Sequence, residues 1–495
     1  MKNRKKFIIA IDQGTTSSRA VLFNIQGKSL FKSQLEFKQY FPKNGWVEHN
    51  PEEIWNKTKK VLVDVIKKSK KLNGDILTIG ITNQRETTIL WDKVSGKPVY
   101  SAIVWQDRRT EDFCKKFRTN NRERLINKKT GLLIDPYFSG TKIKWILDNV
   151  PKAKKLVKNN QLLFGTVDTF LIWKLTKGKM HVTDATNASR TMLFNISTNK
   201  WDKDILFNLR IPKNILPAVK NSSDDFGFTA KSITGNSYPI NGVVGDQQAA
   251  SIGQSCFTKG SVKSTYGTGA FVLVNTGNKK IYSKNKLLTT ICYRLNGKTT
   301  YALEGSIFIA GAGVQWLRDK IKFISSAAET EKIAQSMKSN NGIYLVPAFT
   351  GLGAPYWNPN SRGVICGLTR NTSQKEIVRA TLESVAYQSN DLFNAMKNDG
   401  VKPNLIKVDG GMVKNNWFSQ FLSDVIDTKV IRPKVQETTA LGAAFMAGLR
   451  IGVYNSLKDI SKNWKIDKKF VPKIGKSKRT KLLKEWEQAI RKTLI

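Results

Sequence analysis

The sequence has few of the residues that build metal centres and hydrolytic triads. Its 495 residues include two histidines, His49 and His181, which are isolated from each other. Four cysteines occur, all far apart and without a CxxC pair: Cys114, Cys256, Cys292 and Cys366. These scarcities argue against a zinc site, a Ser-His-Asp triad and a disulfide framework, and they favour reduced, buried thiols.

Long hydrophobic runs are also missing. No apolar stretch reaches the length of about 20 residues that a membrane-spanning helix needs. The N-terminus has lysines and a short apolar run, but Asp12 interrupts this run too early for a secretory signal, and no small-residue cleavage site follows. We therefore expect a cytoplasmic protein without membrane insertion.

Acidic residues are scarce relative to basic ones. The chain has 38 Asp and Glu against 82 Lys and Arg, which gives a formal net charge of +44. One interpretation is a protein that binds nucleic acid or another anionic surface. However, the lysines are dispersed over the whole chain, with no basic tail and no aromatic-plus-basic motif. We favour a lysine-rich, solvated surface around an ordinary enzyme, with no nucleic-acid partner.

The stretch KFIIAIDQGTTSSR, residues 6–19, has the pattern of a phosphate-binding turn. An apolar run predicts a buried strand at 7–11, and Asp12 precedes the small, hydroxyl-rich sequence from Gly14 to Ser18. Such a turn offers backbone N–H groups and hydroxyls to an anion, and Asp12 fits beside it if Mg²⁺ lies between the carboxylate and the phosphate. No Walker sequence GxxxxGK(S/T) occurs. From these residues alone, an ordinary turn is an equal alternative.

Two further polar sites follow apolar, strand-like runs. Arg85 and Glu86 are adjacent, and a donor fork beside an acceptor can pair with the vicinal hydroxyls of a polyol; a surface ion pair is the alternative. Asp246 follows the apolar run at 243–245 and opens a predicted helix. This position suits a general base, and it also suits a helix N-cap.

The second half of the chain repeats the plan of the first. Residues 261–269, SVKSTYGTG, again predict a strand followed by hydroxyls and glycines, and FVLVNTG continues as another strand. Strand–turn–strand is a meander, unlike the strand-then-helix order of a Rossmann unit. We expect two phosphate-embracing turns, one in each half, that face each other across a cleft. A small-residue helix is predicted at 438–450, packed on a sheet.

Together these motifs resemble the FGGY family of carbohydrate kinases, within the actin–hexokinase–Hsp70 superfold. YFSGTKIKWILDN (137–149) and GVICGLTRNTSQKEIVRATLE (363–383) are similar to the two family signatures. DQGTTSSR, TNQRETT, VWQDRRT, VGDQQAA, YGTG, FTGLGAPYWNPNSRG and VDGG stand in the family's order, over nearly the whole chain. Arg85-Glu86, Trp105-Gln106-Asp107 and Tyr137 resemble the members that act on glycerol.

The resemblance implies an α/β protein of two ribonuclease-H-like domains with a cleft between them. Residues 1–252 would form the N-terminal FGGY domain, with the glycerol site and the first phosphate loop, and residues 253–495 the C-terminal FGGY domain, with the nucleotide site. The implied reaction is the phosphorylation of glycerol to sn-glycerol 3-phosphate with ATP and Mg²⁺, in glycerol catabolism. Relatives form dimers and tetramers, so we expect a homodimer or homotetramer. The loop TGNSYP (234–239) lacks the basic residue with which regulated relatives bind a sugar bisphosphate.

The resemblance also implies roles for individual residues. Asp246 would accept the proton of the attacking hydroxyl, and Asp12 and Asp246 would lie near Mg²⁺, directly or through water. The residues expected to bind glycerol are Arg85, Glu86, Trp105, Tyr137, Asp246, Gln247 and Phe271. The residues expected to bind ATP or ADP are Thr15, Thr16, Ser17, Arg19, Thr268, Gly311, Gln315, Gly411 and Asn415. The alternatives are a kinase for another polyol or sugar such as xylulose, an actin- or chaperone-like ATP-binding module, and a nucleic-acid binder.

Overall fold

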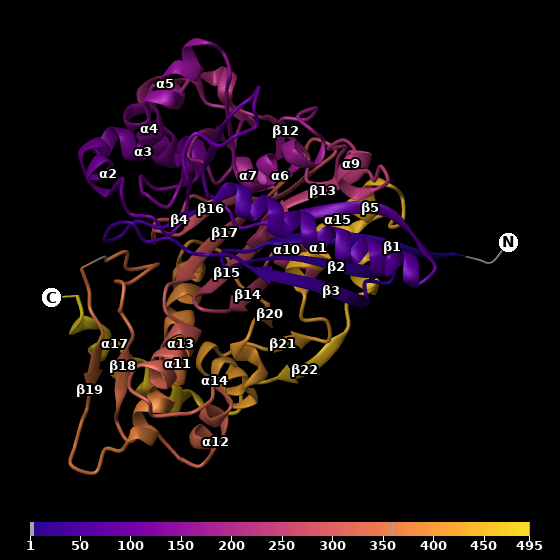
Figure 1. Cartoon of the computed structure of the whole chain (residues 1–495). Helices are drawn as coiled ribbons and strands as arrows, with labels where there is room; N and C mark the ends of the chain where they lie inside the picture. Colours follow the sequence, from indigo (N-terminus) through magenta and orange to yellow (C-terminus); the bar gives the residue numbers. More distant parts are fainter. Residues whose placement is uncertain (1–3, 359, 495) are drawn as a thin grey trace. The chain divides into compact units, whose positions relative to one another are not determined.

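The computed structural model describes residues 4–358 and 360–494 (Figure 1). By their contacts these residues form two compact units, and neither unit is contiguous in sequence. The first runs to Ser255 and also includes Thr289–Tyr301 and Glu437–Asn463, and the second comprises the rest. The predicted division into residues 1–252 and 253–495 does not include these two added segments in the first unit. The domain boundary stays a prediction.

The first unit is built on a five-stranded sheet of order β13-β5-β1-β2-β3. β1 pairs antiparallel with β2 and β2 with β3, which is the predicted meander, while β5 is parallel to β1 and β13 is parallel to β5. β1 extends to Gln13, slightly beyond the predicted end of the strand. The strands are β1 (Lys5–Gln13), β2 (Ser17–Asn24), β3 (Ser29–Glu36), β5 (Gly74–Asn83) and β13 (Ile240–Gly245).

Helix α1 (Pro51–Lys71) covers one face of this sheet. It begins after Asn50, whose side chain accepts hydrogen bonds from the backbone N–H groups of the first turn, and Pro51 takes the first helical position. Apolar residues at helical spacing, among them Ile54, Val61 and Val65, pack in one core with alternate residues of β1. The sequence pattern therefore defines both the start and the buried face of the helix.

The small-residue helix α15 (Thr438–Arg450) packs against β1, β5 and β13 of the same sheet. A Cβ atom on Gly80 of β5 would lie 2.3 Å from the carbonyl oxygen of Ala443, and one on Gly242 of β13 would lie 2.5 Å from the backbone nitrogen of Ala447. Only glycine on the strands permits this backbone approach. The packing explains why Glu437–Asn463 clusters with the first unit.

Shorter elements complete the first unit. They are β4 (Glu48–His49), β6 (Ile89–Asp92), β7 (Ala102–Ile103), α2 (Glu111–Phe117), α3 (Asn120–Thr130), α4 (Ser139–Asn149), α5 (Pro151–Lys158), β8 (Leu162–Gly165), α6 (Val167–Leu175), β9 (Val182–Asp184), α7 (Ala185–Ala188), β10 (Phe194–Asn195), β11 (Lys200–Trp201), α8 (Lys203–Leu209), η1 (Lys213–Ile215), β12 (Ala218–Lys220), α9 (Lys231–Thr234), α10 (Asp246–Gly253) and α16 (Leu457–Lys462).

The second unit repeats the strand plan of the first. β14 pairs antiparallel with β15, β20 is parallel to β14, and β21 is parallel to β20, so β15-β14-β20-β21 matches β2-β1-β5-β13 in order and direction. The weak internal repeat of the sequence is therefore a repeat of sheet topology. The full sheet is β16 (Leu288–Leu295), β17 (Lys298–Ile307), β15 (Ala270–Gly277), β14 (Ser261–Tyr266), β20 (Leu405–Asp409), β21 (Val430–Pro433) and β22 (Ile466–Phe470), of which Thr289–Tyr301 clusters with the first unit.

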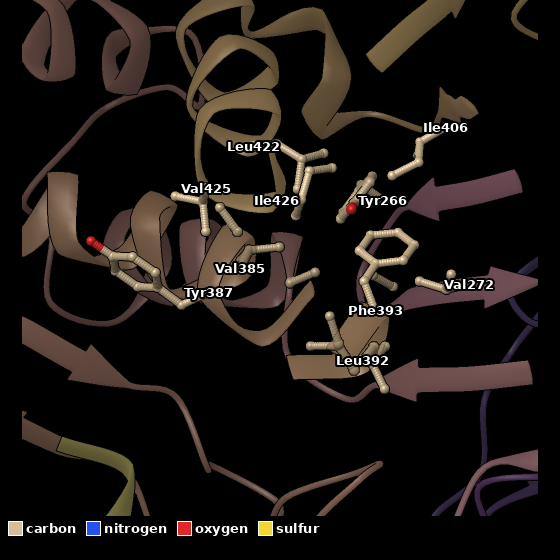
Figure 2. Close-up of a cluster of buried hydrophobic side chains, with 14 of the residues drawn as sticks. Tyr266, Val272, Val385, Tyr387, Leu392, Phe393, Ile406, Leu422, Val425 and Ile426 are labelled. Carbon is tan, nitrogen blue, oxygen red and sulfur yellow. The ribbon is translucent and has the colours of Figure 1, made fainter. Parts of the chain in front are cut away.

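Helices α13 (Gln374–Asn398) and α14 (Asn416–Ile426) pack with this sheet in the core of the second unit (Figure 2). α13 starts at a capping box in which Ser373 and Glu376 exchange hydrogen bonds, and α14 packs against it. The labelled core residues are Tyr266, Val272, Val385, Tyr387, Leu392, Phe393, Ile406, Leu422, Val425 and Ile426. The remaining elements are α11 (Gly311–Asp319), α12 (Glu329–Gln335), β18 (Tyr344–Val346), β19 (Val364–Cys366), η2 (Met412–Lys414) and α17 (Lys476–Arg491).

Substitution of Gly442 tests the contact between α10 and α15. A Cβ atom there would lie 1.9 Å from the carbonyl oxygen of Ala249, and backbone cannot move aside as a side chain can. We predict that Gly442→Ala lowers the free energy of unfolding by about 1 to 3 kcal/mol, measured by denaturant unfolding followed by circular dichroism. The control is Gly475→Ala, where a Cβ atom would meet nothing within 4 Å. Equal stability of the two variants would contradict this packing.

Candidate active site

The sheet of the first unit brings three predicted site residues to one edge. Asp12 lies at the end of β1, Arg85 follows β5 closely, and Asp246 directly follows β13. Because β1, β5 and β13 are parallel, their carboxyl ends meet at the same edge, where ligands of α/β sheets bind. Sheet topology therefore gathers residues that are far apart in sequence.

The hairpin between β1 and β2 carries the predicted phosphate turn. Asp12 is paired with Arg19 across the hairpin, and the backbone N–H of Gly14 donates to the carbonyl of Ser17 at 2.9 Å. A Cβ atom on Gly14 would meet only that carbonyl oxygen, at 3.5 Å, and Thr16 is exposed at the tip. An anion can therefore approach the turn closely. The phosphate contacts predicted for Thr15, Thr16 and Ser17 stay predictions.

Trp105 connects the hairpin with the predicted glycerol residues. Its indole Nε1 donates to the hydroxyl of Thr15 at 2.9 Å, and its ring meets the Tyr137 ring edge to face, with centroids 5.7 Å apart. Trp105, which is predicted to pack on the carbon chain of a polyol, therefore lies beside Thr15, which is predicted to bind phosphate.

Asp12 belongs to a charge cluster at the base of the hairpin. Arg19 donates to Glu437, and its Nη2 lies 3.8 Å from Oδ2 of Asp12. Burial raises the pKa of Asp12 to about 6; Arg19 opposes the rise, and the negative charges of Asp246 and Glu437 add to it. Asp12 and Asp246, the two carboxylates predicted to lie near Mg²⁺, are thus close enough to repel each other.

Arg85 lies among three acceptors. Its Nε is 3.2 Å from Oδ1 of Asp246 and 3.9 Å from Oε1 of Glu86, and its Nη1 donates to Gln248 at 3.2 Å. The side chains of Arg85 and Glu86 are each only 2% exposed, so the alternative of a surface ion pair is wrong, whereas that of Asp246 is 28% exposed. A buried donor and acceptor next to a more open carboxylate suit vicinal hydroxyls.

Asp246 is not the N-cap of α10. Gly245 takes that position, and no side chain caps this helix end. Oδ1 of Asp246 accepts from the backbone N–H of Gln247 at 2.7 Å, in the first turn, where the helix dipole favours a carboxylate. A Cβ atom on Gly245 would lie 2.8 Å from Cδ of Arg85, so glycine here leaves room for the Arg85–Asp246 pair.

Sequence reasoning missed two buried cations next to the predicted glycerol residues. Arg190 donates from Nε to Oε1 of Glu86 at 2.6 Å, and Lys142 donates from Nζ to the backbone carbonyl of Tyr137 at 2.6 Å. Burial lowers the pKa of Lys142 to about 8, with Glu86 the largest opposing influence. Lys142 belongs to the stretch 137–149 and Arg190 to DATNASR, but nothing local in either sequence identifies their partners.

The predicted nucleotide residues from Thr268 onward lie in the second unit, around the turn that repeats the first hairpin. The carbonyl of Thr268 accepts from the backbone N–H groups of Ala310 and Ala312 at 2.9 and 3.0 Å. A Cβ atom on Gly311 would lie 2.6 Å from the carbonyl oxygen of Gly267, so the start of α11 packs directly on the turn. Gly311 thus has a packing role that needs no nucleotide, and its predicted nucleotide contact is untested.

The paired glycines after β20 differ from each other. Gly410 has a φ of +96°, and a Cβ atom there would lie 2.4 Å from the carbonyl oxygen of Tyr266, so it is required by the fold. A Cβ atom on Gly411 would meet nothing within 4 Å, which leaves space for a ligand. Asn415 caps α14 by accepting from the N–H of Phe418 at 2.8 Å.

Three further predicted residues have simple placements. Gln315 is exposed on α11, Gln247 follows Asp246 in α10, and Phe271 lies on β15 of the second unit. The nucleotide role of Gln315 and the glycerol roles of Gln247 and Phe271 stay predictions.

Within residues 4–358 and 360–494, no group of three or more His, Cys, Asp or Glu side chains is arranged to hold a metal ion. Within the same described ranges, no helix has both the length and the apolar character needed to cross a membrane.

Comparison with known proteins covers nearly the whole chain. The FGGY family of carbohydrate kinases matches with its N-terminal domain at residues 7–253 and its C-terminal domain at residues 262–451. Glycerol kinase from Alteromonas mediterranea is 56% identical over 484 residues, and glycerol kinase 1 from Pseudomonas aeruginosa is 54% identical over 486 residues; each match covers 98% of both chains.

Solved structures agree with this assignment. Glycerol kinase from Plasmodium falciparum, with ADP, matches with a TM-score of 0.94 and 40% identity over 99% of both chains. Xylulose kinase from Lactobacillus acidophilus, at 23% identity, shares the fold with a TM-score of 0.85 over 98% of this chain and 97% of the other.

The fold and the site thus define a kinase with two mixed α/β domains of the actin–hexokinase type, which confirms the predicted fold class. The chain belongs to the FGGY family of carbohydrate kinases. The oligomeric state and the cytoplasmic location stay predictions.

The raised pKa of Asp12 gives a pH-dependent test. Because the folded pKa, about 6, lies above the ordinary 3.8, the folded state binds more protons between these values, and stability falls as pH rises through them. We predict that Asp12→Asn stabilises the ligand-free protein at pH 7 by on the order of 1 to 3 kcal/mol, with little gain below about pH 4. Thermal unfolding between pH 4 and 7.5 measures this, with Asp148→Asn, an exposed carboxylate on α4, as the control. A gain that shrinks with rising pH would contradict the assignment.

Proposed function

We propose that the protein transfers the terminal phosphoryl group of ATP to a terminal hydroxyl of glycerol, which gives sn-glycerol 3-phosphate and ADP. The observation that carries this proposal is the cluster of Arg85, Glu86 and Asp246 at the same sheet edge as Asp12 and its hairpin. The full-length similarity to glycerol kinases at 54–56% identity supports the choice of glycerol over larger sugars.

Glycerol binds through hydroxyl pairing and apolar packing. Arg85 donates and Glu86 accepts, and because both are buried, an analogue that lacks a hydroxyl leaves one of them without its hydrogen bond. Trp105 and Phe271 pack on the carbon chain, and Tyr137, Gln247 and Asp246 supply further hydrogen bonds. This arrangement selects a short polyol by its hydroxyls.

Asp246 is the general base. An alcohol is a weak nucleophile near neutral pH, so a carboxylate within hydrogen-bond reach assists by accepting the hydroxyl proton as the O–P bond forms. Arg85 orients the carboxylate through their 3.2 Å contact, and the partial exposure of Asp246 leaves room for the hydroxyl.

Two groups of residues are proposed to bind the nucleotide. Thr15, Thr16, Ser17 and Arg19 bind its phosphates, and Thr268, Gly311, Gln315, Gly411 and Asn415 bind the rest of ADP or ATP. In phosphoryl transfer the protein acts mainly by positioning the reactants and stabilising charge, which suits backbone N–H groups, hydroxyls and an arginine.

Asp12 and Asp246 fit a magnesium ion. Carboxylate oxygens are preferred ligands of Mg²⁺, which commonly takes one or two carboxylates plus phosphate oxygens and water, so no larger protein cluster is needed. The mutual repulsion that helps to raise the pKa of Asp12 is relieved by a cation. When bound, Mg²⁺ neutralises charge on the phosphates.

Release of ADP by the purified protein tests the proposed reaction. ATP and Mg²⁺ are supplied with glycerol, with xylulose or without an acceptor, and ADP is followed by a coupled assay. We expect fast release with glycerol and slow release otherwise, because an open-chain triol matches the buried pair. Release that is equal with and without glycerol would refute the proposal.

Replacement of the base gives a second prediction. Asp246→Asn keeps the size of the side chain but cannot accept the proton, so we expect kcat to fall by about 10²- to 10⁴-fold while ADP still binds. Asp112→Asn, at an exposed position of α2, is the control and should keep kcat. Near wild-type turnover of Asp246→Asn would exclude this residue as the base.

A further inference from the structure

A buried polar segment, DATNASRT at residues 184–191, lies against the proposed glycerol site, and the function described above gives it no role. Asp184, the first residue of the segment, stabilises the conformation of the backbone that follows it. Asp184 accepts from the backbone N–H groups of Thr186 and Asn187, both at 2.9 Å, and from the hydroxyl of Ser222 at 2.8 Å. The segment is therefore rigid before any substrate binds.

The segment contacts the end of β13, the end of β5 and the loop that follows β5. The hydroxyl of Thr186 accepts from the N–H of Gly245, next to Asp246, at 2.8 Å. The side chain of Asn187 accepts from Asn83, at the end of β5, at 3.0 Å. Arg190 reaches Glu86 itself. One short segment thus sets the relative positions of the two substrate loops.

Arg190 is the charged member of this segment. It is fully buried, and its Nε is 2.6 Å from Oε1 of Glu86. Its guanidinium carbon also lies 5.6 Å from the centre of the Tyr137 ring and 5.5 Å from that of Phe138. It therefore touches two residues proposed to bind glycerol.

The backbone conformation of Glu86 is one that its surroundings, including Arg190, must stabilise. Its φ of +61° is in the left-handed region, which is unfavourable for a residue with a long side chain. Nε of Arg85 lies 3.9 Å from Oε1 of Glu86, which is farther than its 3.2 Å distance from Oδ1 of Asp246. Because Arg190 occupies Oε1 at a shorter distance, Arg85 remains directed to Asp246.

We propose that Arg190 is a positioning residue for the polyol: it fixes the carboxylate of Glu86 and the ring of Tyr137 and keeps Arg85 paired with Asp246. This inference rests on the proposed function. Arg190 acts through Glu86, so it determines glycerol affinity and discrimination without contributing to nucleotide binding.

A double-mutant cycle tests this role. Steady-state kinetics are measured for Arg190→Gln, Glu86→Gln and the double variant, with the KM for glycerol and for ATP determined separately. We expect each single change to raise the glycerol KM by about tenfold or more and to leave the ATP KM within about twofold. The double variant should be no worse than the poorer single variant, because both changes break one interaction.

Controls separate positioning from folding. Arg294→Gln removes another buried arginine, one that bonds Asn221 and the carbonyl of Val219, and should leave the glycerol KM unchanged. Arg190→Lys keeps the charge and should lie between wild type and Arg190→Gln in glycerol KM; it replaces Arg190→Gln in the cycle if that variant does not fold.

Two results would overturn the inference. One is a glycerol KM that is unchanged in the Arg190 variants, and the other is a double variant whose loss equals the product of the single losses. Either result, obtained with a wild-type enzyme that is active on glycerol, refutes the positioning role alone. A wild-type enzyme inactive on glycerol refutes the proposed function instead.

Discussion

Four buried or half-buried side chains of alternating charge form a continuous series: Arg190, Glu86, Arg85 and Asp246. Successive charged atoms are 2.6, 3.9 and 3.2 Å apart. Removing one partner of a buried ion pair costs about 3 to 5 kcal/mol, because it leaves the other charge without compensation. The geometry that we propose to receive glycerol is therefore maintained by the folded protein before the substrate arrives.

The sheet explains how this series meets the phosphate turn. Three parallel strands, β1, β5 and β13, end at one edge with Asp12, Arg85 and Asp246 at or just beyond their ends. Glycines on two of these strands let α15 approach the backbone, and the segment that begins with Glu437 then supplies the partner of Arg19. The packing of α15 on the sheet and the orientation of Arg19 are thus coupled in the first unit.

Local sequence was sufficient for some of these features. The apolar run before Asp12, the Asn50–Pro51 helix start and the small-residue helix at 438–450 have short-range signals, and the structure has the corresponding β1, α1 and α15. Partners distant in sequence had no such signal: Arg19 and Glu437 are 418 residues apart, and Glu86 and Arg190 are 104 apart. The sequence also has no signal that the Glu437–Asn463 segment belongs to the first unit. The backbone contacts that glycines permit do not produce a hydrophobic pattern.

A crystal structure with glycerol and ADP bound tests the central claim most directly. The account predicts that glycerol lies against the Arg85–Glu86 pair, with one terminal hydroxyl within hydrogen-bond distance of the Asp246 carboxylate. Glycerol bound elsewhere, with Arg85, Glu86 and Asp246 still bonded only to protein groups, would contradict the account.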